Sequence, residues 1–431
     1  MELSHLIILL ILLGCMATMV PVFMCLFFTA VVGFMLYTDL PLLLLAQSLF
    51  RSMDNFALVV VLYFILCGNI MTSGVIVQRL MKVANVLVSW LPGGLGMAGI
   101  LGCGLFGAIS GSTVATVVAL GGFMIPALLQ NKYHEDYSVG VMTAAPNLGV
   151  IIPPSIGMIL YSMISNVSLE GLFLTGFLPG ILMIIGMCFY TWAIHRNKTD
   201  FVRMPVPSFK DVLKVLKEGF WSLMLPVIIF GGIFSGAFTA NEAAVVACVY
   251  ALFVELFIHK GIKFKDVFKI TVSSAVTSAT LLIIVAGATC FGRYLTLEAI
   301  PAKITEAVLA YISSPWVFLL AINLLLVGIG MLMDIISATM ILGPVFLPML
   351  GAFGIDPMHF GLILTVNLAI GYCTPPMGVS LYITGAIANK NLVFVSRAVL
   401  PFIAIQYAVL ALITYIPKVT LWLPRVMGFL D

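Results

Sequence analysis

Long stretches without a charged side chain decide what this chain can fold into. No Asp, Glu, Lys or Arg occurs in residues 3–38, 83–131 or 137–169. About 20 apolar residues in a helix cross a hydrocarbon layer of roughly 30 Å. Of the 431 residues, 62% are apolar and 9% are charged, whereas a soluble domain is roughly 25% charged. The sequence therefore predicts a polytopic membrane protein.

Hydropathy predicts membrane segments that are helical throughout. The alternating pattern of a membrane β-barrel is absent, and a helix satisfies every backbone group internally, so we expect an all-α fold. The N-terminus lacks a basic region and a cleavage site, so we expect it to be the first span. The predicted spans lie near 5–18, 19–37, 54–77, 136–165, 172–194, 219–236, 240–258, 270–292, 356–388 and 393–423.

Basic residues gather in two clusters. One lies in residues 196–218 and the other in residues 260–269. Two predicted spans separate the clusters, so both lie on one face of the membrane, which the positive-inside rule makes cytoplasmic. The first cluster also falls at the middle of the chain, where we expect a linker.

The two halves of the chain repeat in register. The glycines Gly121 and Gly149 recur as Gly343 and Gly371, 222 residues later. Shared composition does not fix spacing, so we interpret the pattern as an internal repeat. The prolines at 126, 153, 154 and 179 recur at 348, 375, 376 and 401 with the same offset.

An odd number of predicted crossings separates equivalent points of the repeat. The halves are therefore expected to have inverted topology, which is typical of many secondary transporters. We expect residues 1–195 to form the first repeat, 196–218 a cytoplasmic linker, and 219–431 the second repeat.

Two apolar segments carry a polar centre. Residues 97–131 contain Ser110-Gly111-Ser112-Thr113, and residues 315–352 contain Asp334. The limbs around these centres suit a re-entrant helical hairpin better than a full crossing. A glycine-rich packing helix remains the alternative for the first segment.

Asp334 is the sharpest functional signal. It is the only Asp, Glu, Lys or Arg between Glu306 and Asp356. A carboxylate at mid-membrane costs at least about 2.5–3.5 kcal/mol and marks an ion or substrate path by default. No basic partner for a structural ion pair lies nearby in the sequence.

Proline pairs interrupt two predicted spans, 136–165 and 356–388. The breaks free backbone carbonyls that suit Na⁺, while helix N-termini at the breaks attract anions. A proline kink that only shapes packing is the alternative. Four polar residues stand beside the breaks: Asn147, Ser155, Asn367 and Thr374.

Of two other charged residues, Arg293 has two possible roles and Glu242 has one. Arg293 either snorkels to the outer surface or pairs with a carboxylate substrate through two parallel hydrogen bonds. Glu242 follows Thr239 in a T-x-x-E pattern, which predicts a capping box at a helix start.

Several motifs together resemble one family. They are "ILCGNIM", "FGAISGSTVAT", "LGVIIPPSIGMILYS", "GMLMDI" and "NLAIGYCTPPMG". The chain resembles, over nearly its whole length, the large membrane subunit of tripartite ATP-independent periplasmic (TRAP) transporters. The resemblance implies a subunit of the bacterial inner membrane that imports an organic acid, such as a C4-dicarboxylate or sialic acid, with co-transported Na⁺. It also implies an elevator motion of a transport domain against a scaffold, a small four-span membrane subunit and a periplasmic binding protein as partners.

The resemblance also implies which residues bind. One Na⁺ site would use Ser110, Ser112, Asn147 and Gly149, and the other would use Asp334, Gly371 and Thr374. From the residues themselves, and not from the resemblance, Arg293, Ser155 and Asn367 are predicted to contact the substrate. At least two Na⁺ ions and no organic cofactor are expected. Residues 335–337 and 145–147 depart from the family pattern as Ile-Ile-Ser and Ala-Pro-Asn.

Other function classes have weaker support. The chain lacks HExxH and GxSxG, and its eight cysteines and five histidines are scattered, so we do not expect an enzyme. "GCGLFG" fits GxGxxG but follows no predicted strand. A net charge of +3 is too small to indicate nucleic acid as a partner. An ion channel or a membrane scaffold subunit without coupled transport remains the alternative.

Overall fold

The computed structural model describes residues 3–18, 20–38, 40–197 and 205–430. These residues form helices joined by turns, with no strand among them, which confirms the predicted all-α fold. Seven of the helices are long and apolar enough to cross a membrane, or eight if one bent pair counts as a span. The spans therefore account for much of the apolar sequence.

The first four helices precede the first hairpin. The bent pair is α3 and α4, which meet at 53°. The predicted span 54–77 is therefore α4 alone, and the polar helix α3 before it escaped the hydropathy prediction. The four are α1 (Leu3–Ala17), α2 (Val22–Tyr37), α3 (Leu43–Met53) and α4 (Ala57–Ser73).

The rest of the first half runs from a connecting helix through a hairpin and a broken helix to a long helix. The connecting helix is α5 (Ile76–Val88). The hairpin comprises α6 (Gly94–Ser110), α7 (Thr113–Thr116), the π-turn η1 (Val117–Gly121) and α8 (Gly122–Gln130). The broken helix comprises α9 (Glu135–Ala144), the 3-10 turn η2 (Ala145–Asn147), α10 (Leu148–Ile151) and α11 (Ile156–Ser165), and α12 (Leu169–His195) follows.

The second half has the same order of elements. Its first helices are α13 (Phe209–Phe234), α14 (Ala240–Phe253), which continues as the π-turn η3 (Val254–Ile258), and α15 (Phe264–Leu297). The connecting helix α16 (Ile300–Tyr311) leads to a hairpin of α17 (Pro315–Gly330) and α18 (Ile335–Phe353). The broken helix of α19 (Pro357–Gly371) and α20 (Val379–Ala388) precedes α21 (Leu392–Tyr415) and α22 (Pro417–Val426).

Equivalent helices begin at equivalent positions. Thr113 at the start of α7 and Ile335 at the start of α18 lie 222 residues apart, as do Glu135 of α9 and Pro357 of α19. Each proline pair contains a cis peptide bond. The spacing seen in the sequence thus extends to the helix boundaries.

Two predicted boundaries are wrong. Within the predicted linker 196–218, residues 198–204 lie outside the described part, but 209–218 form the first turns of α13. The backbone N–H of Ser208 donates to the Asp211 carboxylate at 3.1 Å and starts this helix early. The predicted span 393–423 ends at Tyr415, because Pro417 begins a separate helix.

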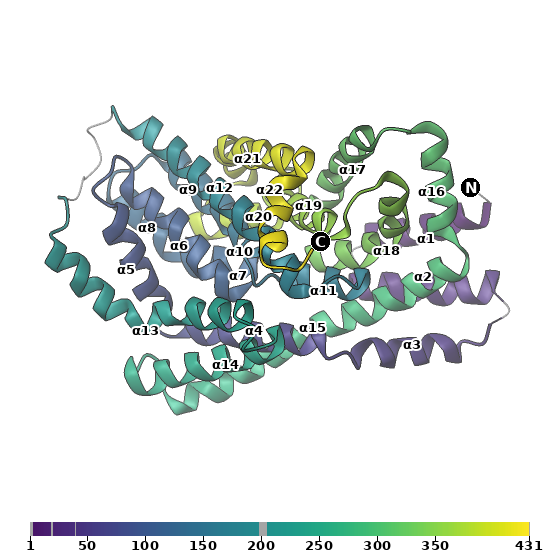
Figure 1. Cartoon of the computed structure of the whole chain (residues 1–431), viewed down its shortest axis with the longest axis horizontal. Helices are drawn as coiled ribbons and strands as arrows, with labels where there is room; N and C mark the ends of the chain where they lie inside the picture. The colour runs from purple at the N-terminus through teal and green to yellow at the C-terminus, as the bar shows by residue number, and fades with distance from the viewer. Residues whose placement is uncertain (1–2, 19, 39, 198–204, 431) are drawn as a thin grey trace.

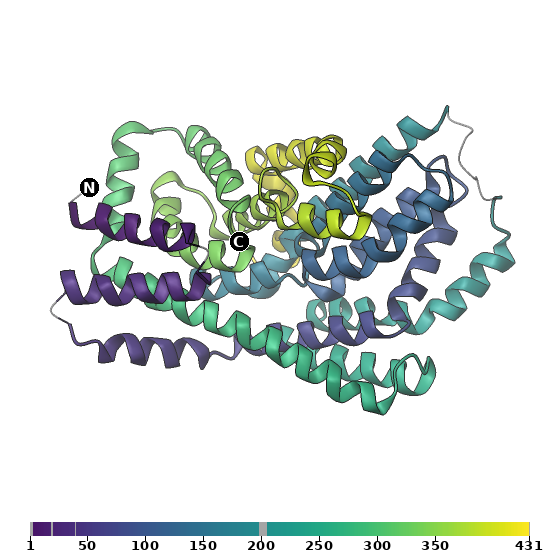
Figure 2. The same ribbon diagram turned by 180° about the vertical axis from the view of Figure 1, so that it is seen from behind.

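The long helix α15 organises one side of the molecule. It packs against α2, α3 and α4, and also against α18 of the second hairpin. Figure 1 shows α15 with α3, α4 and α14 along the lower part, and the hairpins and broken helices above them. Figure 2 shows the same two layers from behind. Every residue of α19 after Pro357 is buried, so this broken helix lies at the centre of the core.

A buried carboxylate attaches the connecting helix α5 to η3 of the second half. Glu255 of η3 is fully buried. Its Oε1 atom accepts hydrogen bonds from the backbone N–H groups of Val75 and Ile76, both at 2.7 Å. These are unpaired donors at the start of α5, where negative charge is favoured by the helix dipole. The helix that leads into the first hairpin is thereby held against the second half of the chain.

Candidate functional site

The first hairpin turns at a small oxygen-rich tip. Gly111 has φ +62°, a left-handed conformation that favours glycine. Ser112 then caps α7, and its carbonyl accepts a hydrogen bond from the Thr116 hydroxyl at 2.8 Å. The Ser110 and Thr116 hydroxyl oxygens lie 3.4 Å apart. Three oxygen-bearing side chains therefore meet at this tip.

The first broken helix lies directly against that tip. A Cβ atom on Gly149 would come within 2.7 Å of the Thr116 Oγ1 atom and 3.1 Å of the Ser112 carbonyl oxygen. A Cβ atom on Gly107 would come within 2.8 Å of the Gly149 nitrogen. Only glycines allow the helix backbones to approach this closely, so the break and the tip share one small space.

The second hairpin tip is built around the predicted carboxylate. Asp334 caps α18: its Oδ2 atom accepts from the Ser337 N–H at 2.9 Å, and its Oδ1 atom accepts from the Ser337 hydroxyl at 2.6 Å. The Ile335 N–H donates to the Tyr372 hydroxyl oxygen at 2.9 Å, so the second break also contacts its tip. A Cβ atom on Gly371 would come within 2.6 Å of the Gly330 Cα atom.

Both tips line a single cavity of about 760 Å³, which we call the tip cavity. Among the residues that the structure describes, Asp334 is the only charged side chain in its lining. A volume of this size lies within the roughly 300–1,000 Å³ usual for small-molecule sites. Its polar wall comprises Ser110, Ser112, Thr113, Asp334 and Tyr372 from the hairpins and second break, with Asn69, Thr72 and Thr277 from α4 and α15.

Asn147 lies deeper than the cavity. Its side chain is fully buried, and its amide nitrogen donates to the Gln406 Oε1 atom at 2.9 Å and to the Cys373 Sγ atom at 3.1 Å. Its Oδ1 atom is buried and has no hydrogen-bond partner among the described residues. A buried amide oxygen without a donor is suited to a bound cation.

Three further predicted residues do not line the tip cavity. Ser155 is buried and caps α11 by accepting from the Met158 N–H at 3.4 Å. The Thr374 hydroxyl donates to the Ile370 carbonyl at 2.8 Å and lies 3.2 Å from the Tyr407 hydroxyl. Asn367 donates to the Asn323 Oδ1 atom at 2.6 Å, inside the second half.

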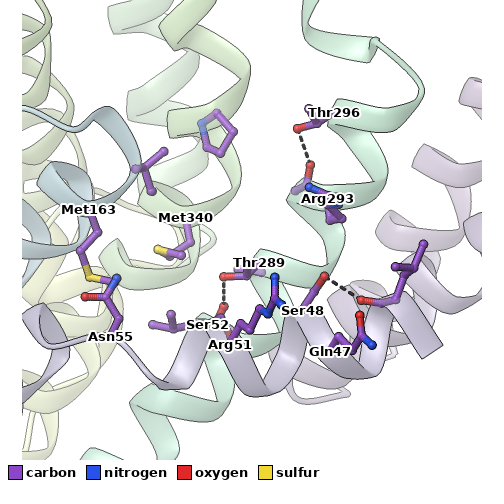
Figure 3. Close-up of a pocket in the computed structure, with 16 residues that line it drawn as sticks. Gln47, Ser48, Arg51, Ser52, Asn55, Met163, Thr289, Arg293, Thr296 and Met340 are labelled. Atoms are coloured by element: carbon purple, nitrogen blue, oxygen red, sulfur yellow. Dashed lines mark hydrogen bonds between the residues drawn. The ribbon is translucent and has the colours of Figure 1, made fainter. Parts of the chain in front are cut away.

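Arg293 lies at a different cavity. This cavity of about 550 Å³ is also lined by Arg51, so we call it the arginine cavity. Figure 3 shows polar side chains of α3 and α15 together on one side, with Met163 and Met340 opposite them. The structure thus brings Ser110, Ser112 and Asp334 together and separates them from Arg293.

Sequence reasoning missed three residues: Thr116 at the first hairpin tip, Tyr372 at the tip cavity and Arg51 at the arginine cavity. Thr116 lies four residues after Ser112, a spacing that places both on one helix face. Tyr372 follows the predicted site residue Gly371 directly. Arg51 had no such signal, because α3 was not predicted as a helix.

A solved structure shares this fold. The crystal structure of the Alcanivorax borkumensis YdaH transporter, reported to have an unusual topology, matches with a TM-score of 0.62 over 90% of each chain. The two sequences are 15% identical, so the likeness concerns the fold alone.

Sequence comparison identifies the family. The model of the tripartite ATP-independent periplasmic transporter, DctM component, matches residues 9–419. The C4-dicarboxylate TRAP transporter large permease protein DctM of Rhodobacter capsulatus is 35% identical, over 99% of this chain and 100% of its own. The sialic acid TRAP transporter large permease protein SiaM of Vibrio cholerae is 36% identical over 96% of both chains. The isethionate TRAP transporter permease protein DctMQ of Oleidesulfovibrio alaskensis is 36% identical, over 89% of this chain and 60% of its own. This chain therefore belongs to the DctM family of TRAP transporter large permeases, and it is a multi-pass transport subunit of the bacterial inner membrane rather than an enzyme.

Proposed function

We propose that this permease couples the import of an organic acid to the entry of Na⁺. The observation that carries the proposal is the tip cavity, where Ser110, Ser112 and Asp334 from the two hairpins face one space. A single carboxylate among neutral oxygens favours a monovalent cation over an anion. The Asp334 carboxylate by itself would repel an acidic substrate. A bound cation would offset this repulsion and make the cavity suitable for such a substrate.

At least two Na⁺ ions are proposed, one at each tip. The first site would use Ser110, Ser112, Gly149 and the unpaired Oδ1 atom of Asn147. The close approach of Gly149 to the Ser112 carbonyl supports this site, because it gathers oxygens from two elements.

The second site would use Asp334 with Gly371 and Thr374. The contact of Gly371 with Gly330 supports it, since this contact brings the second break to the tip that carries the carboxylate. The Thr374 hydroxyl is hydrogen-bonded to the Ile370 carbonyl, so its oxygen would bind the ion through a remaining lone pair.

The motion is proposed to be of the elevator type between inverted repeats. The hairpins and broken helices would form the transport domain, and α2–α4 with α13–α15 the scaffold. Support comes from the shared order of elements in both halves and from the connecting helices α5 and α16, which join scaffold helices to hairpins in each half. The basic clusters would face the cytoplasm.

The substrate is proposed to be a small organic acid delivered by a periplasmic binding protein. The relatives are named for a C4-dicarboxylate, sialic acid and isethionate, all of which carry an acidic group. Arg293, Ser155 and Asn367 are proposed substrate contacts. A small four-span membrane subunit would complete the transporter within the lipid.

The test is uptake by proteoliposomes that contain the permease, its small subunit and the binding protein. Uptake of labelled succinate, N-acetylneuraminate or isethionate should require an inward Na⁺ gradient and stop when K⁺ replaces Na⁺. Uptake that continues unchanged without a Na⁺ gradient would rule out coupling. Passive flux in both directions without the binding protein would instead indicate a channel.

A further inference from the structure

One face of α3 carries most of the polar residues of that helix. Gln47, Ser48, Arg51, Ser52 and Asn55 are spaced three and four residues apart, so they lie on one helical face or just past its end. All of them line the arginine cavity. In a chain that is 62% apolar, a polar helix face that lines an open cavity points to a functional role.

A matching face of α15 lies opposite. Thr289, Gly292, Arg293 and Thr296 follow the same three-and-four spacing and line the same cavity. Figure 3 shows the side chains of α3 and α15 around this shared space. The Thr289 and Thr296 hydroxyls donate to carbonyls of their own helix, at 2.9 Å each. Their oxygens remain able to accept, while the two arginines supply donors.

Neither arginine has an internal counterion. Within the described ranges, no ion pair or hydrogen bond joins the side chain of Arg51 or Arg293 to another residue, and both residues are exposed. No Asp or Glu of the described part of the chain lines the arginine cavity. Two guanidinium groups, each able to form two parallel hydrogen bonds with a carboxylate, therefore lie at one space without an acid.

The arginine cavity is separate from the tip cavity. Between them lies an apolar constriction of about 10 Å³, too small for an organic acid, lined by Leu58, Leu160, Leu282 and their neighbours. The constriction shares Val285 with the arginine cavity and Leu281 with the tip cavity.

The three spaces follow one another along α15. Thr277 lines the tip cavity and Arg293 the arginine cavity. At 1.5 Å per residue they lie about 24 Å apart along the helix. The second basic cluster, proposed to be cytoplasmic, stands at the other end of α15, so the arginine cavity is nearer the periplasm.

We propose that Arg51 and Arg293 form an outer docking site, in which the acidic group of an organic anion binds before the anion reaches the tip cavity. The proposal rests on the proposed function, which decides that the arginine cavity faces the periplasm. The polar wall belongs to scaffold helices α3 and α15, whereas the facing wall is made of Met163 of α11 with Met340 and Pro344 of α18. Movement of α11 and α18 would open the constriction while the arginines stay on the scaffold.

The test uses Gln47→Cys, which places a thiol in the arginine cavity of the full chain in lipid nanodiscs. The labelling rates of an anionic reagent (2-sulfonatoethyl methanethiosulfonate) and a cationic one (its trimethylammonium analogue) are compared. The unsubstituted chain measures the background from native cysteines, six of which are buried and two half-buried. The positive field of the two arginines should make the introduced thiol react about tenfold faster with the anionic reagent than with the cationic one.

Substitution then separates charge from geometry. Arg51→Gln with Arg293→Gln should abolish the preference for the anionic reagent, and Arg397→Gln on α21 should leave it unchanged. Succinate, N-acetylneuraminate or isethionate should slow the labelling saturably, and glycerol should not. Arg51→Lys with Arg293→Lys should keep the reagent preference but weaken protection about tenfold, because lysine lacks the bidentate fork.

Two results would overturn the proposal. One is an unchanged reagent preference in the double Gln variant, and the other is the absence of protection by all three anions. The labelling requires no Na⁺ gradient, so the docking site can be refuted by an experiment that leaves Na⁺-driven uptake untouched. Conversely, loss of Na⁺ coupling would leave the labelling result intact.

Discussion

Gly371 of the second broken helix lies directly against Gly330 at the end of α17. A Cβ atom on Gly371 would come within 2.6 Å of the Gly330 Cα atom and 2.7 Å of its carbonyl oxygen. Gly149 and Gly107 make the corresponding contact in the first half. Backbone atoms cannot rotate away as a side-chain end can, so neither contact tolerates an added methyl group.

Gly371→Ala is therefore expected to push the second hairpin away from the second broken helix. Overpacking of this kind costs about 1–3 kcal/mol, and we expect a lower melting temperature together with loss of Na⁺-dependent uptake. Gly351→Ala in α18 is the control, because nothing lies within 4 Å of its Cβ position. Equal uptake by both variants would contradict a functional role for the contact.

Asp334→Asn is expected to separate the charge of Asp334 from its capping role. The asparagine oxygen still accepts from the Ser337 N–H, so the helix start should remain stable. Loss of a charged ligand, at about 1.5–3 kcal/mol, should raise the half-saturating Na⁺ concentration about 10–100-fold.

Asp356→Asn provides the matched control. Asp356 caps α19 by accepting from the Met358 N–H at 2.7 Å, and it does not line the tip cavity. Its substitution should leave the Na⁺ dependence of uptake unchanged. If the two variants have the same Na⁺ dependence, Asp334 is only a cap.

Asn147→Ala and Asn367→Ala are expected to alter different transport parameters. Both asparagines are buried, and both have an Oδ1 atom without a partner in the described part of the chain. Asn147→Ala should mainly raise the half-saturating Na⁺ concentration. Asn367→Ala should mainly raise the half-saturating concentration of the organic acid. Melting temperatures of both variants measure the structural cost, and a change in the same single parameter in both would refute the assignment.

Glu255→Ala is expected to destabilise the protein more than Glu242→Ala. Loss of the Glu255 carboxylate leaves the buried N–H group of Ile76 unpaired, at about 1–3 kcal/mol, together with that of the half-buried cap residue Val75. Glu242 is an exposed residue of the capping box, bonded to Thr239, and water can replace the hydrogen bonds that its loss removes. Thermal unfolding in detergent compares the two variants, and a smaller loss for Glu255 would exclude its role in anchoring α5.

Local and periodic features were predictable from the sequence. Apolar runs determine the helical membrane fold because no other structure satisfies their backbone in lipid. The Thr239–Glu242 capping box is confirmed, since both residues lie within one helical turn. The proline pairs indicated where α10 and α19 end, because proline cannot continue a helix. The polar helix α3 was missed because its face toward the cavity lowers the hydropathy of its sequence.

The sequence by itself determined the all-α class, the positions of the breaks and the isolation of Asp334 in an apolar segment, because each depends on residues within a few turns. Only the tertiary structure decided which of the polar groups meet. Asn147 bonds Gln406, 259 residues away, and Arg51 of α3 shares a cavity with Arg293 of α15. Such pairings depend on how whole helices pack and on which face each helix presents to its neighbours. The spacing of residues along the chain does not determine this packing.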